Sequence, residues 1–228
     1  MQILAHRGFW GDSMLQITQN RTPNSLKSFK HAFQNGFGIE SDLRDFDLQL
    51  VISHDMPNAN ALKAEQLFAL YQQFAHKSNT NPANLPPLAL NIKADGLQNL
   101  LKKLLKKYQI QNYFCFDMSV PDMRIFAQNG LNFFTRISEI EQKCALYDEA
   151  QGVWCDEFYS HWISESTILA HLENGKKVAI VSPELHKRQY LSAWRDYKQI
   201  IESNALSGDS RIFLCTDFPH LAKEFFNE

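Results

Sequence analysis

The stretch Leu88-Ala89-Leu90-Asn91-Ile92, together with the segment 97–108 that follows it, decides the fold of this chain. The five-residue run is apolar except for Asn91, which is typical of a buried strand. In the segment after it, leucines recur at helical spacing and four lysines occupy the opposite face. We interpret these lysines as the solvent face of a helix rather than as a site for an anionic partner. The stretch therefore predicts a strand followed by an amphipathic helix.

The same unit of a strand followed by a helix recurs along the whole chain. Apolar runs predict strands at 3–5, 39–43, 88–92, 113–116, 133–137, 153–155, 178–181 and 212–215, with a further extended piece at 50–53. Amphipathic patterns predict helices at 25–35, 67–75, 97–108, 122–129, 139–150, 166–174 and 188–203, and a short last helix after Pro219. The polar segments 58–61 and 79–87 are interpreted as loops, not linkers. Eight such units predict one domain of the α/β class, a (β/α)8 TIM barrel over residues 1–228.

Composition and charge exclude several classes of protein. Hydrophobic residues make up 44% of the chain and charged residues 21%, the balance of an ordinary globular protein. With a net charge of −2 and no basic stretch, we expect no nucleic-acid partner. No apolar run approaches the ~20 residues of a transmembrane segment, and the first residues lack a signal-peptide pattern. The four cysteines form no C-x-x-C pair, so we expect reduced, buried thiols in a cytoplasmic protein.

Polar residues gather where the predicted strands end. In a barrel of this kind the carboxyl ends of the strands form the active site. Solvation of strand ends accounts for two or three such residues but not for a set of this size. The residues at these ends are His6, Arg7, Glu40, Asp42, His54, Asp55, Asn91, Lys93, Asp117, Arg136, Asp156, Thr216 and Asp217.

Glu40 and Asp42 suggest a metal site. They lie two apart on a predicted strand, so both side chains point to the same face and repel each other unless a cation neutralises them. Oxygen ligands suit a hard divalent ion, Mg²⁺ or Ca²⁺. Asn91 and Lys93 have the same spacing, as expected for a further oxygen ligand beside a cation that binds phosphate. The alternative is that Glu40 and Asp42 are an exposed acidic pair that binds no cation. The presence of His6 and His54 on adjoining segments favours the metal site instead.

Several short motifs also follow one another in a recognisable order. They are His6-Arg7-Gly8, Pro23-Asn24-Ser25-Leu26, Glu40-Ser41-Asp42, His54-Asp55, Leu90-Asn91-Ile92-Lys93 and Thr216-Asp217-Phe218-Pro219. Their order and spacing resemble those of the glycerophosphodiester phosphodiesterase family, most clearly over the first 55 residues. The resemblance implies a TIM barrel that cleaves a phosphodiester with the help of a metal ion.

The resemblance also implies roles for these residues. Glu40 and Asp42 would hold Mg²⁺ or Ca²⁺, and Arg7 and Lys93 would bind the phosphate of a small glycerol- or sugar-linked phosphodiester. His6 and His54 would be the general base and the general acid, in an order that the sequence leaves open. In this family a neighbouring hydroxyl of the substrate is thought to attack first and give a cyclic phosphate.

Two departures from the family pattern bear on this assignment. The acid of the family's Pro-Glu-Asn motif is missing from Pro23-Asn24-Ser25, and the third metal-ligating glutamate falls on Asn91. We expect the Asn91 amide oxygen to ligate the metal, with Asp117 as an extra acid, although Asn91 could instead only hydrogen-bond across the barrel. The alternative functions are a phosphate-ligand-binding barrel with weak or lost turnover, and a lyase that releases a cyclic phosphate as its final product.

The middle of the chain, about 95–210, carries little family signal. Its Trp154, Asp156, Trp162 and the stretch Ser182-Pro183-Glu184-Leu185-His186 point to a subgroup with its own substrate. The alcohol part of that substrate and the oligomeric state stay open. The histidines outside the motifs are predicted to be ordinary surface residues, namely His31, His76, His161, His171, His186 and His220.

Overall fold

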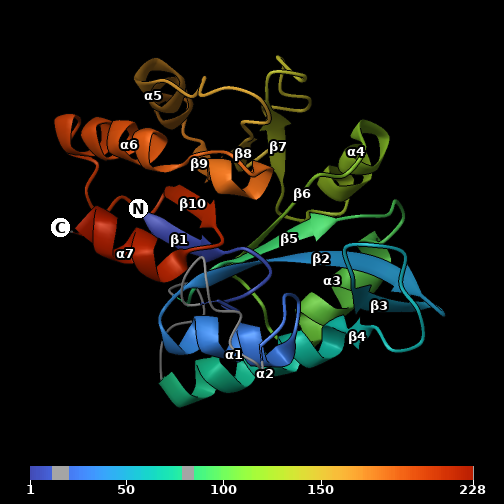
Figure 1. Ribbon diagram of the computed structural model, residues 1–228. Helices are drawn as coiled ribbons and strands as arrows, with labels where there is room; N and C mark the ends of the chain where they lie inside the picture. Colours follow the sequence, from blue (N-terminus) through green and yellow to red (C-terminus); the bar gives the residue numbers. More distant parts are fainter. Residues whose placement is uncertain (12–20, 79–84, 228) are drawn as a thin grey trace.

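Eight parallel strands form the centre of the fold (Figure 1). The computed structural model describes residues 1–11, 21–78 and 85–227. The parallel strands are β1 (Gln2–Ala5), β2 (Gly38–Phe46), β5 (Leu88–Ile92), β6 (Tyr113–Phe116), β7 (Phe134–Ile137), β8 (Gly152–Cys155), β9 (Lys177–Val181) and β10 (Ile212–Thr216). They pair in the order β6-β5-β2-β1-β10-β9-β8-β7. The two ends of this curled sheet, β6 and β7, are joined by a parallel bridge between Cys115 and Phe133.

Helices cover the outside of the sheet in two groups. One group is α1 (Leu26–Gln34), α2 (Ala64–Ser78), α3 (Gln98–Lys107) and α4 (Val120–Gln128), and the other is α5 (Glu165–Glu173), α6 (Leu191–Ser203) and α7 (Pro219–Asn227) (Figure 1). Each group packs its apolar face on the strands nearest to it. Helix α1 begins where the sequence predicts, since the Ser25 hydroxyl accepts the backbone N–H of Ser28.

The predicted helix at 139–150 is wrong, because this segment consists of turns among the described residues. Its acidic side chains have partners outside a helix. The Glu139 carboxylate accepts the backbone N–H groups of 158–160 at 2.9–3.0 Å, and Glu141 pairs with Arg136. The structure therefore has the eight parallel strands of a TIM barrel, but no α-helix follows β7 in the part of the chain that it describes.

The interior of the curled sheet is filled with aromatic side chains. The Phe114 ring stacks on Phe134, and the Phe116 ring on Trp154, each pair with centroids 3.8 Å apart. Gly152 makes room for this packing, since a Cβ atom there would lie 2.6 Å from the Phe134 ring. Of these rings, Phe116 and Trp154 also line the cavity that opens at the carboxyl ends of the strands.

The chain leaves the parallel pattern once, after β2. Strand β2 extends beyond the sheet, turns at Asp47 and Leu48, where φ is positive, and returns as antiparallel β3 (Gln49–Ile52), which pairs with the short β4 (Leu62–Lys63). This confirms the extended piece predicted at 50–53. The excursion carries His54 back over the carboxyl end of the sheet.

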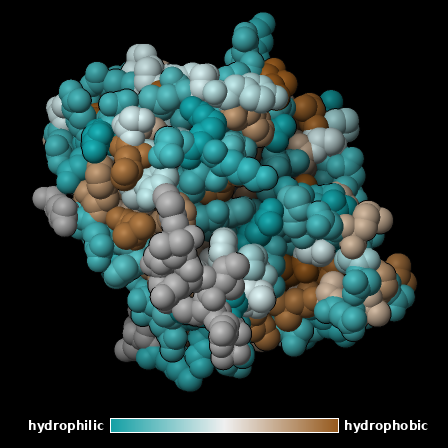
Figure 2. Space-filling model, viewed as in Figure 1, coloured by the Kyte–Doolittle hydropathy of each residue, from teal (hydrophilic) through white to brown (hydrophobic). Residues whose placement is uncertain are grey.

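Other features of the sequence are placed as follows. Cys115, Cys155 and Cys215 are buried, Cys144 is half-buried, and all four are free thiols. Of the loop predicted at 79–87, residues 79–84 lie outside the described residues. None of the described helices is both long enough and apolar enough to span a membrane. Hydrophilic residues predominate on the face seen in Figure 2, with hydrophobic ones in separate groups.

Candidate active site

The carboxyl ends of the strands surround one cavity of about 330 Å³. The side chains predicted for the site come together on its wall, and all of them lie between His6 and Asp117 in the chain. These are His6, Arg7, Glu40, Asp42, His54, Asn91, Lys93 and Asp117. Arg136, Asp156 and His186 lie on the same wall. The predicted set therefore shares one cavity, while the role of each residue stays a prediction.

Strand register brings the two predicted acids to this cavity. Strands β2 and β5 are parallel neighbours in which Asp42 lies opposite Asn91. Because side chains alternate along a strand, Glu40 and Asp42 point inward, whereas Ile39 and Leu43 belong to the apolar layer beneath the helices. The spacing of two residues thus places both carboxylates inside the sheet, as the sequence predicts.

A tight turn places Arg7 at the mouth. Gly8 has a φ of +86°, and a Cβ atom there would lie 2.5 Å from the Ser28 hydroxyl, so only glycine fits between β1 and α1. The backbone N–H of Arg7 donates to the Glu40 carboxylate at 3.3 Å, and its Nε lies 3.2 Å from Asp42 Oδ2. The main chain of Arg7 thus contacts Glu40, and its side chain contacts Asp42.

Asn24 is a site residue that the sequence analysis missed. It enters the sequence analysis only within the Pro23-Asn24-Ser25-Leu26 motif, with no role assigned to it, and Ser25 is the N-cap of α1. The Asn24 amide donates to Asp42 Oδ2 at 2.9 Å and accepts the Ser41 hydroxyl at 3.1 Å. Its φ of 56° is a left-handed conformation that Asn tolerates better than most residues. The feature of the sequence that could have indicated this role is an asparagine directly before the N-cap residue of a helix.

His6 is held between two acids. Its Nδ1 lies 2.7 Å from Asp217 Oδ1 and its Nε2 3.9 Å from Glu40 Oε2. Burial disfavours the charged ring, but the hydrogen bond to Asp217 and the negative charges of both acids outweigh it and raise the pKa of His6. Asp217 is itself fixed, because its backbone N–H and the Thr216 hydroxyl donate to the half-buried Glu184 carboxylate at 3.1 and 2.5 Å.

The inner wall carries buried oxygen atoms without hydrogen-bond partners. Asp42 Oδ1 and Asn91 Oδ1 are both of this kind. Burial, with the nearby Asp42 charge, raises the pKa of Glu40 to about 7. The Lys93 ammonium lies 3.5 Å from Asp42 Oδ1 and 3.6 Å from Asp117 Oδ2. Two carboxylates and an amide oxygen are the donors that hard cations prefer.

The described residues contain no cluster of three or more His, Cys, Asp or Glu side chains that could hold a metal. The candidate donor set therefore consists of Glu40, Asp42 and the amide of Asn91. Its fit to a cation rests on two features: the unpartnered oxygens, and the raised pKa of Glu40, whose negative charge a cation would stabilise.

His54 lies at the rim of the cavity. Its side chain is 46% exposed, and its Nδ1 lies 2.9 Å from the Asp55 carboxylate. The backbone is held in place because Arg44 Nε donates to the His54 carbonyl at 3.2 Å. Of the two predicted catalytic histidines, His6 is therefore the enclosed one and His54 the open one.

His186 is not the ordinary surface residue that the sequence predicts. It ends the short 3₁₀ helix η2 (Pro183–His186), directly after β9, and this turn directs its ring into the cavity. His186 Nε2 lies 2.5 Å from Asp156 Oδ1. The prediction failed because no motif marked His186, although the stretch 182–186 already stood out from the family pattern.

Asp117 has a partner of its own. Its Oδ1 is bonded to the Arg136 guanidinium, which also bonds Glu141. The predicted extra acid is thus in the cavity wall, tied to Arg136 on one side and near Lys93 on the other.

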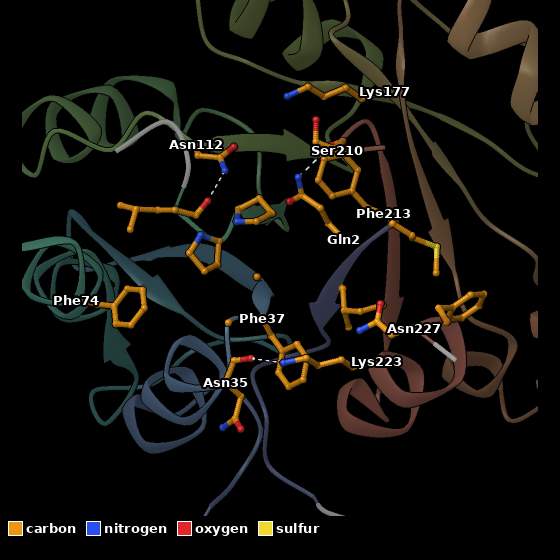
Figure 3. A pocket seen from close by; sticks show the side chains of 18 residues that line it. Gln2, Asn35, Phe37, Phe74, Asn112, Lys177, Ser210, Phe213, Lys223 and Asn227 are labelled. Carbon is orange, nitrogen blue, oxygen red and sulfur yellow. Dashed lines mark hydrogen bonds between the residues drawn. The ribbon is translucent and has the colours of Figure 1, made fainter. Parts of the chain in front are cut away.

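A larger cavity of about 700 Å³ lies at the opposite end of the sheet (Figure 3). Phe37, Phe74 and Phe213 line it, and its charged side chains are Lys177 and Lys223. Among the described residues that line it there is no carboxylate or imidazole side chain. The predicted carboxylate and imidazole side chains line the other cavity, at the carboxyl ends of the strands.

Comparison with known proteins bears on the fold. No family model and no curated protein sequence matches this chain. Its structure is similar to a glycerophosphoryl diester phosphodiesterase from Parabacteroides distasonis, with a TM-score of 0.64 and 15% identity over 99% of this chain and 86% of that one. A glycerophosphodiester phosphodiesterase from Agrobacterium tumefaciens gives a TM-score of 0.60 and 12% identity over 99% and 98%.

An Oleispira antarctica phosphodiesterase in complex with its product, sn-glycerol-3-phosphate, gives a TM-score of 0.66 and 14% identity over 100% of this chain and 97% of that one. Such coverage confirms, at the level of the fold, the family resemblance that the sequence motifs predict. The likeness extends through the middle of the chain, where those motifs are absent.

Proposed function

We propose that this chain is a metal-dependent phosphodiesterase that hydrolyses a small glycerol- or sugar-linked phosphodiester by histidine acid–base catalysis. The observation that carries the proposal is the inner wall of the small cavity. There the unpartnered oxygens of Asp42 and Asn91 lie beside the buried Glu40, with the cations Arg7 and Lys93 next to them. We also propose that the curled sheet corresponds to the closed eight-stranded barrel of the similar structures, with turns in place of the helix between β7 and β8.

The cation would be Mg²⁺ or Ca²⁺, held by the carboxylates of Glu40 and Asp42 and the amide oxygen of Asn91. When bound, it stabilises the negative charge of the phosphoryl oxygens. Asn24 supports this set, because its amide holds Asp42 Oδ2 and leaves Oδ1 directed away from that bond.

Arg7 and Lys93 would bind the phosphate. Each cation lies within 3.5 Å of a carboxylate oxygen of Asp42, so the wall offers positive charge beside the acids. A phosphodiester carries one negative charge, and a guanidinium with an ammonium group provides several donors to its two free oxygens. Asp117 would position Lys93 from the opposite side.

His6 and His54 would transfer the protons. One imidazole takes the proton of the attacking hydroxyl, whose oxygen forms a new bond to phosphorus. The other gives a proton to the leaving oxygen as its bond to phosphorus breaks. When the attacking hydroxyl belongs to the substrate, the product is a cyclic phosphate, which water then opens in a second round. The carboxylate partners, Asp217 and Asp55, hold the two rings in place through their Nδ1 atoms.

The second candidate is a barrel that binds a phosphate ligand with weak or lost turnover. It is favoured by one observation, namely that an amide stands at Asn91, so the donor set has only two carboxylates. The cation is then held more weakly, because affinity follows the number of charged ligands.

A turnover assay separates these candidates. Purified protein is given glycerophosphodiesters with Mg²⁺, with Ca²⁺ or with a chelator, and phosphomonoester release is followed. We expect turnover that the chelator abolishes and that is lost in Glu40→Gln and Asp42→Asn. Asp45→Asn, an exposed acid farther along β2, is the matched control and should retain full activity. Ligand binding without turnover would favour the phosphate-binding barrel. The absence of both binding and turnover would exclude both candidate functions.

A further inference from the structure

We infer that His186 and Asp156 form a recognition site for the hydroxyl groups on the alcohol arm of the substrate. This inference rests on the proposed function, since it concerns the same cavity. It assigns the substrate class as phosphodiesters with a small, hydroxylated alcohol, and it makes His186 a specificity-determining residue.

The pair lies across the cavity from the predicted metal ligands. In the strand order, β8 is four strands away from β2 in either direction around the sheet. Asp156 follows β8, whereas Glu40 and Asp42 lie on β2. A phosphate bound beside β2 would therefore direct one of its arms toward Asp156 and His186.

The size of the cavity limits that arm. At about 330 Å³ the cavity is near the lower end for small-molecule sites, so it fits a compact alcohol and not a long acyl chain. Its wall near the pair is partly apolar. Leu185 lines it beside His186, and the Phe158 ring lies with its centroid 4.8 Å from that of His186. Such surfaces pack against the C–H groups of a polyol while polar groups read its hydroxyls.

The pair presents hydrogen-bond acceptors that are free for a ligand. His186 Nε2 is engaged with Asp156 Oδ1 at 2.5 Å. A neutral ring that donates from Nε2 has an unprotonated Nδ1, which accepts. Among the described residues, neither His186 Nδ1 nor Asp156 Oδ2 has a protein hydrogen-bond partner. Two neighbouring acceptors suit the two O–H donors of a glycerol-like alcohol.

Neighbouring contacts hold the pair in place before any ligand binds. The Trp162 indole donates to the Asp156 carbonyl at 2.8 Å, and Arg188 Nη1 donates to the Glu157 carbonyl at 2.7 Å. Only 9% of the Asp156 side chain and 22% of the His186 side chain are exposed. A site fixed in this way loses little entropy on binding, which favours selectivity.

Among the described residues that line the cavity near His186 and Asp156, Arg136 is a further polar group, and it already has hydrogen-bond partners. Its guanidinium bonds both Asp117 and Glu141. The acceptors of His186 and Asp156 are therefore the groups that can distinguish a hydroxylated arm from an apolar one.

The test compares three phosphodiesters of glycerol that differ only in the second arm: glyceryl, propyl or aminoethyl. All three leave as primary alcohols, so differences in rate report recognition of the arm. We expect the wild type to prefer the glyceryl over the propyl arm. His186→Ala should raise KM for the glyceryl arm by about 10- to 100-fold and leave KM for the propyl arm within about threefold, with kcat changed less than KM.

Three further variants complete the experiment. His186→Gln, which offers an amide oxygen as acceptor, should recover part of the preference, and Asp156→Asn should weaken it. His76→Ala, an exposed histidine near the end of α2, should behave as the wild type. Thermal unfolding of each variant checks that the fold is intact.

Other outcomes would overturn the inference. An equal loss on all three arms would make His186 a structural or catalytic residue, and a selective loss on the aminoethyl arm would make the pair a cation site. If no arm is turned over, the proposed function fails separately. Titration calorimetry of the glyceryl and propyl esters then decides, because a wild type without preference for the glyceryl ester would overturn the inference.

Discussion

Asp42 and Asn91 lie opposite each other in the parallel register of β2 and β5, and the Oδ1 atom of each is buried without a hydrogen-bond partner. An unpartnered buried oxygen is costly, on the order of 1–3 kcal/mol. Two of them on neighbouring strands, beside the buried Glu40, are explained if a cation completes their bonding. The first prediction tests this explanation directly.

Asn91→Glu should tighten binding of Mg²⁺ or Ca²⁺, on the order of tenfold, because a third carboxylate adds negative charge to the ligand set. The same change should destabilise the metal-free protein, since it adds like charge next to Glu40 and Asp42. Titration calorimetry and metal-free unfolding measure the two effects. Unchanged metal affinity in a folded variant would remove Asn91 from the metal site and leave it as a hydrogen-bonding residue of the interior.

His6→Ala and His54→Ala should each lower kcat by about 10²- to 10⁴-fold, the usual range for loss of a general acid or base. The fold should persist in both, and His54→Ala should affect stability less because His54 is half exposed. Steady-state kinetics with the best glycerophosphodiester provide the measurement, and His76→Ala is the control. Near-wild-type rates in both variants would show that the assigned roles are wrong.

Glu184→Gln should disturb His6 through Asp217. The half-buried Glu184 carboxylate accepts the Asp217 backbone N–H and the Thr216 hydroxyl, and an amide can satisfy these donors only in part. We expect kcat to fall by about tenfold or more, as a small displacement of a catalytic group does. A shift in the acidic limb of the pH–rate profile should accompany this fall. Glu173→Gln, an exposed residue at the end of α5, is the control, and an unchanged pH profile would limit Glu184 to a structural role.

The metal-free protein should lose stability as the pH rises from about 4.5 to about 7. The pKa of Glu40 is raised from 4.5 in the unfolded chain to about 7 in the folded one, so the folded state binds the extra proton in this window. Stability is therefore greatest below the unfolded pKa and declines as the folded carboxyl ionises. The raised pKa of His6 acts in the same direction at somewhat higher pH.

The difference between wild type and Glu40→Gln isolates the first of these contributions. Urea unfolding at pH 5 and pH 8 should give a smaller change in the free energy of unfolding for the variant. Added Mg²⁺ or Ca²⁺ should reduce the loss in the wild type, because the cation stabilises the ionised carboxyl. Identical pH dependence in the two proteins would contradict the raised pKa of Glu40.

Sequence alone determined the strands of this fold and much of its site. Strand β5 occupies the predicted residues 88–92, since five consecutive residues buried on both faces leave a clear apolar pattern. The spacing of Glu40 and Asp42 was equally readable, because alternation along a strand is a local rule. Local patterns did not determine the segment 139–150, where Glu139 bonds backbone groups 19 to 21 residues later in the chain.

Only the tertiary structure decided which residues complete the cavity. Asn24 bonds an acid 18 residues later, and His186 bonds an acid 30 residues earlier. Neither contact follows from spacing, because each depends on which strands pair: Asn24 follows β1, the neighbour of β2, and His186 follows β9, the neighbour of β8. Alternation along a strand is set by the geometry of a few peptide units, whereas the meeting of His186 with Asp156 depends on the pairing of β8 with β9 and on the η2 turn that follows β9.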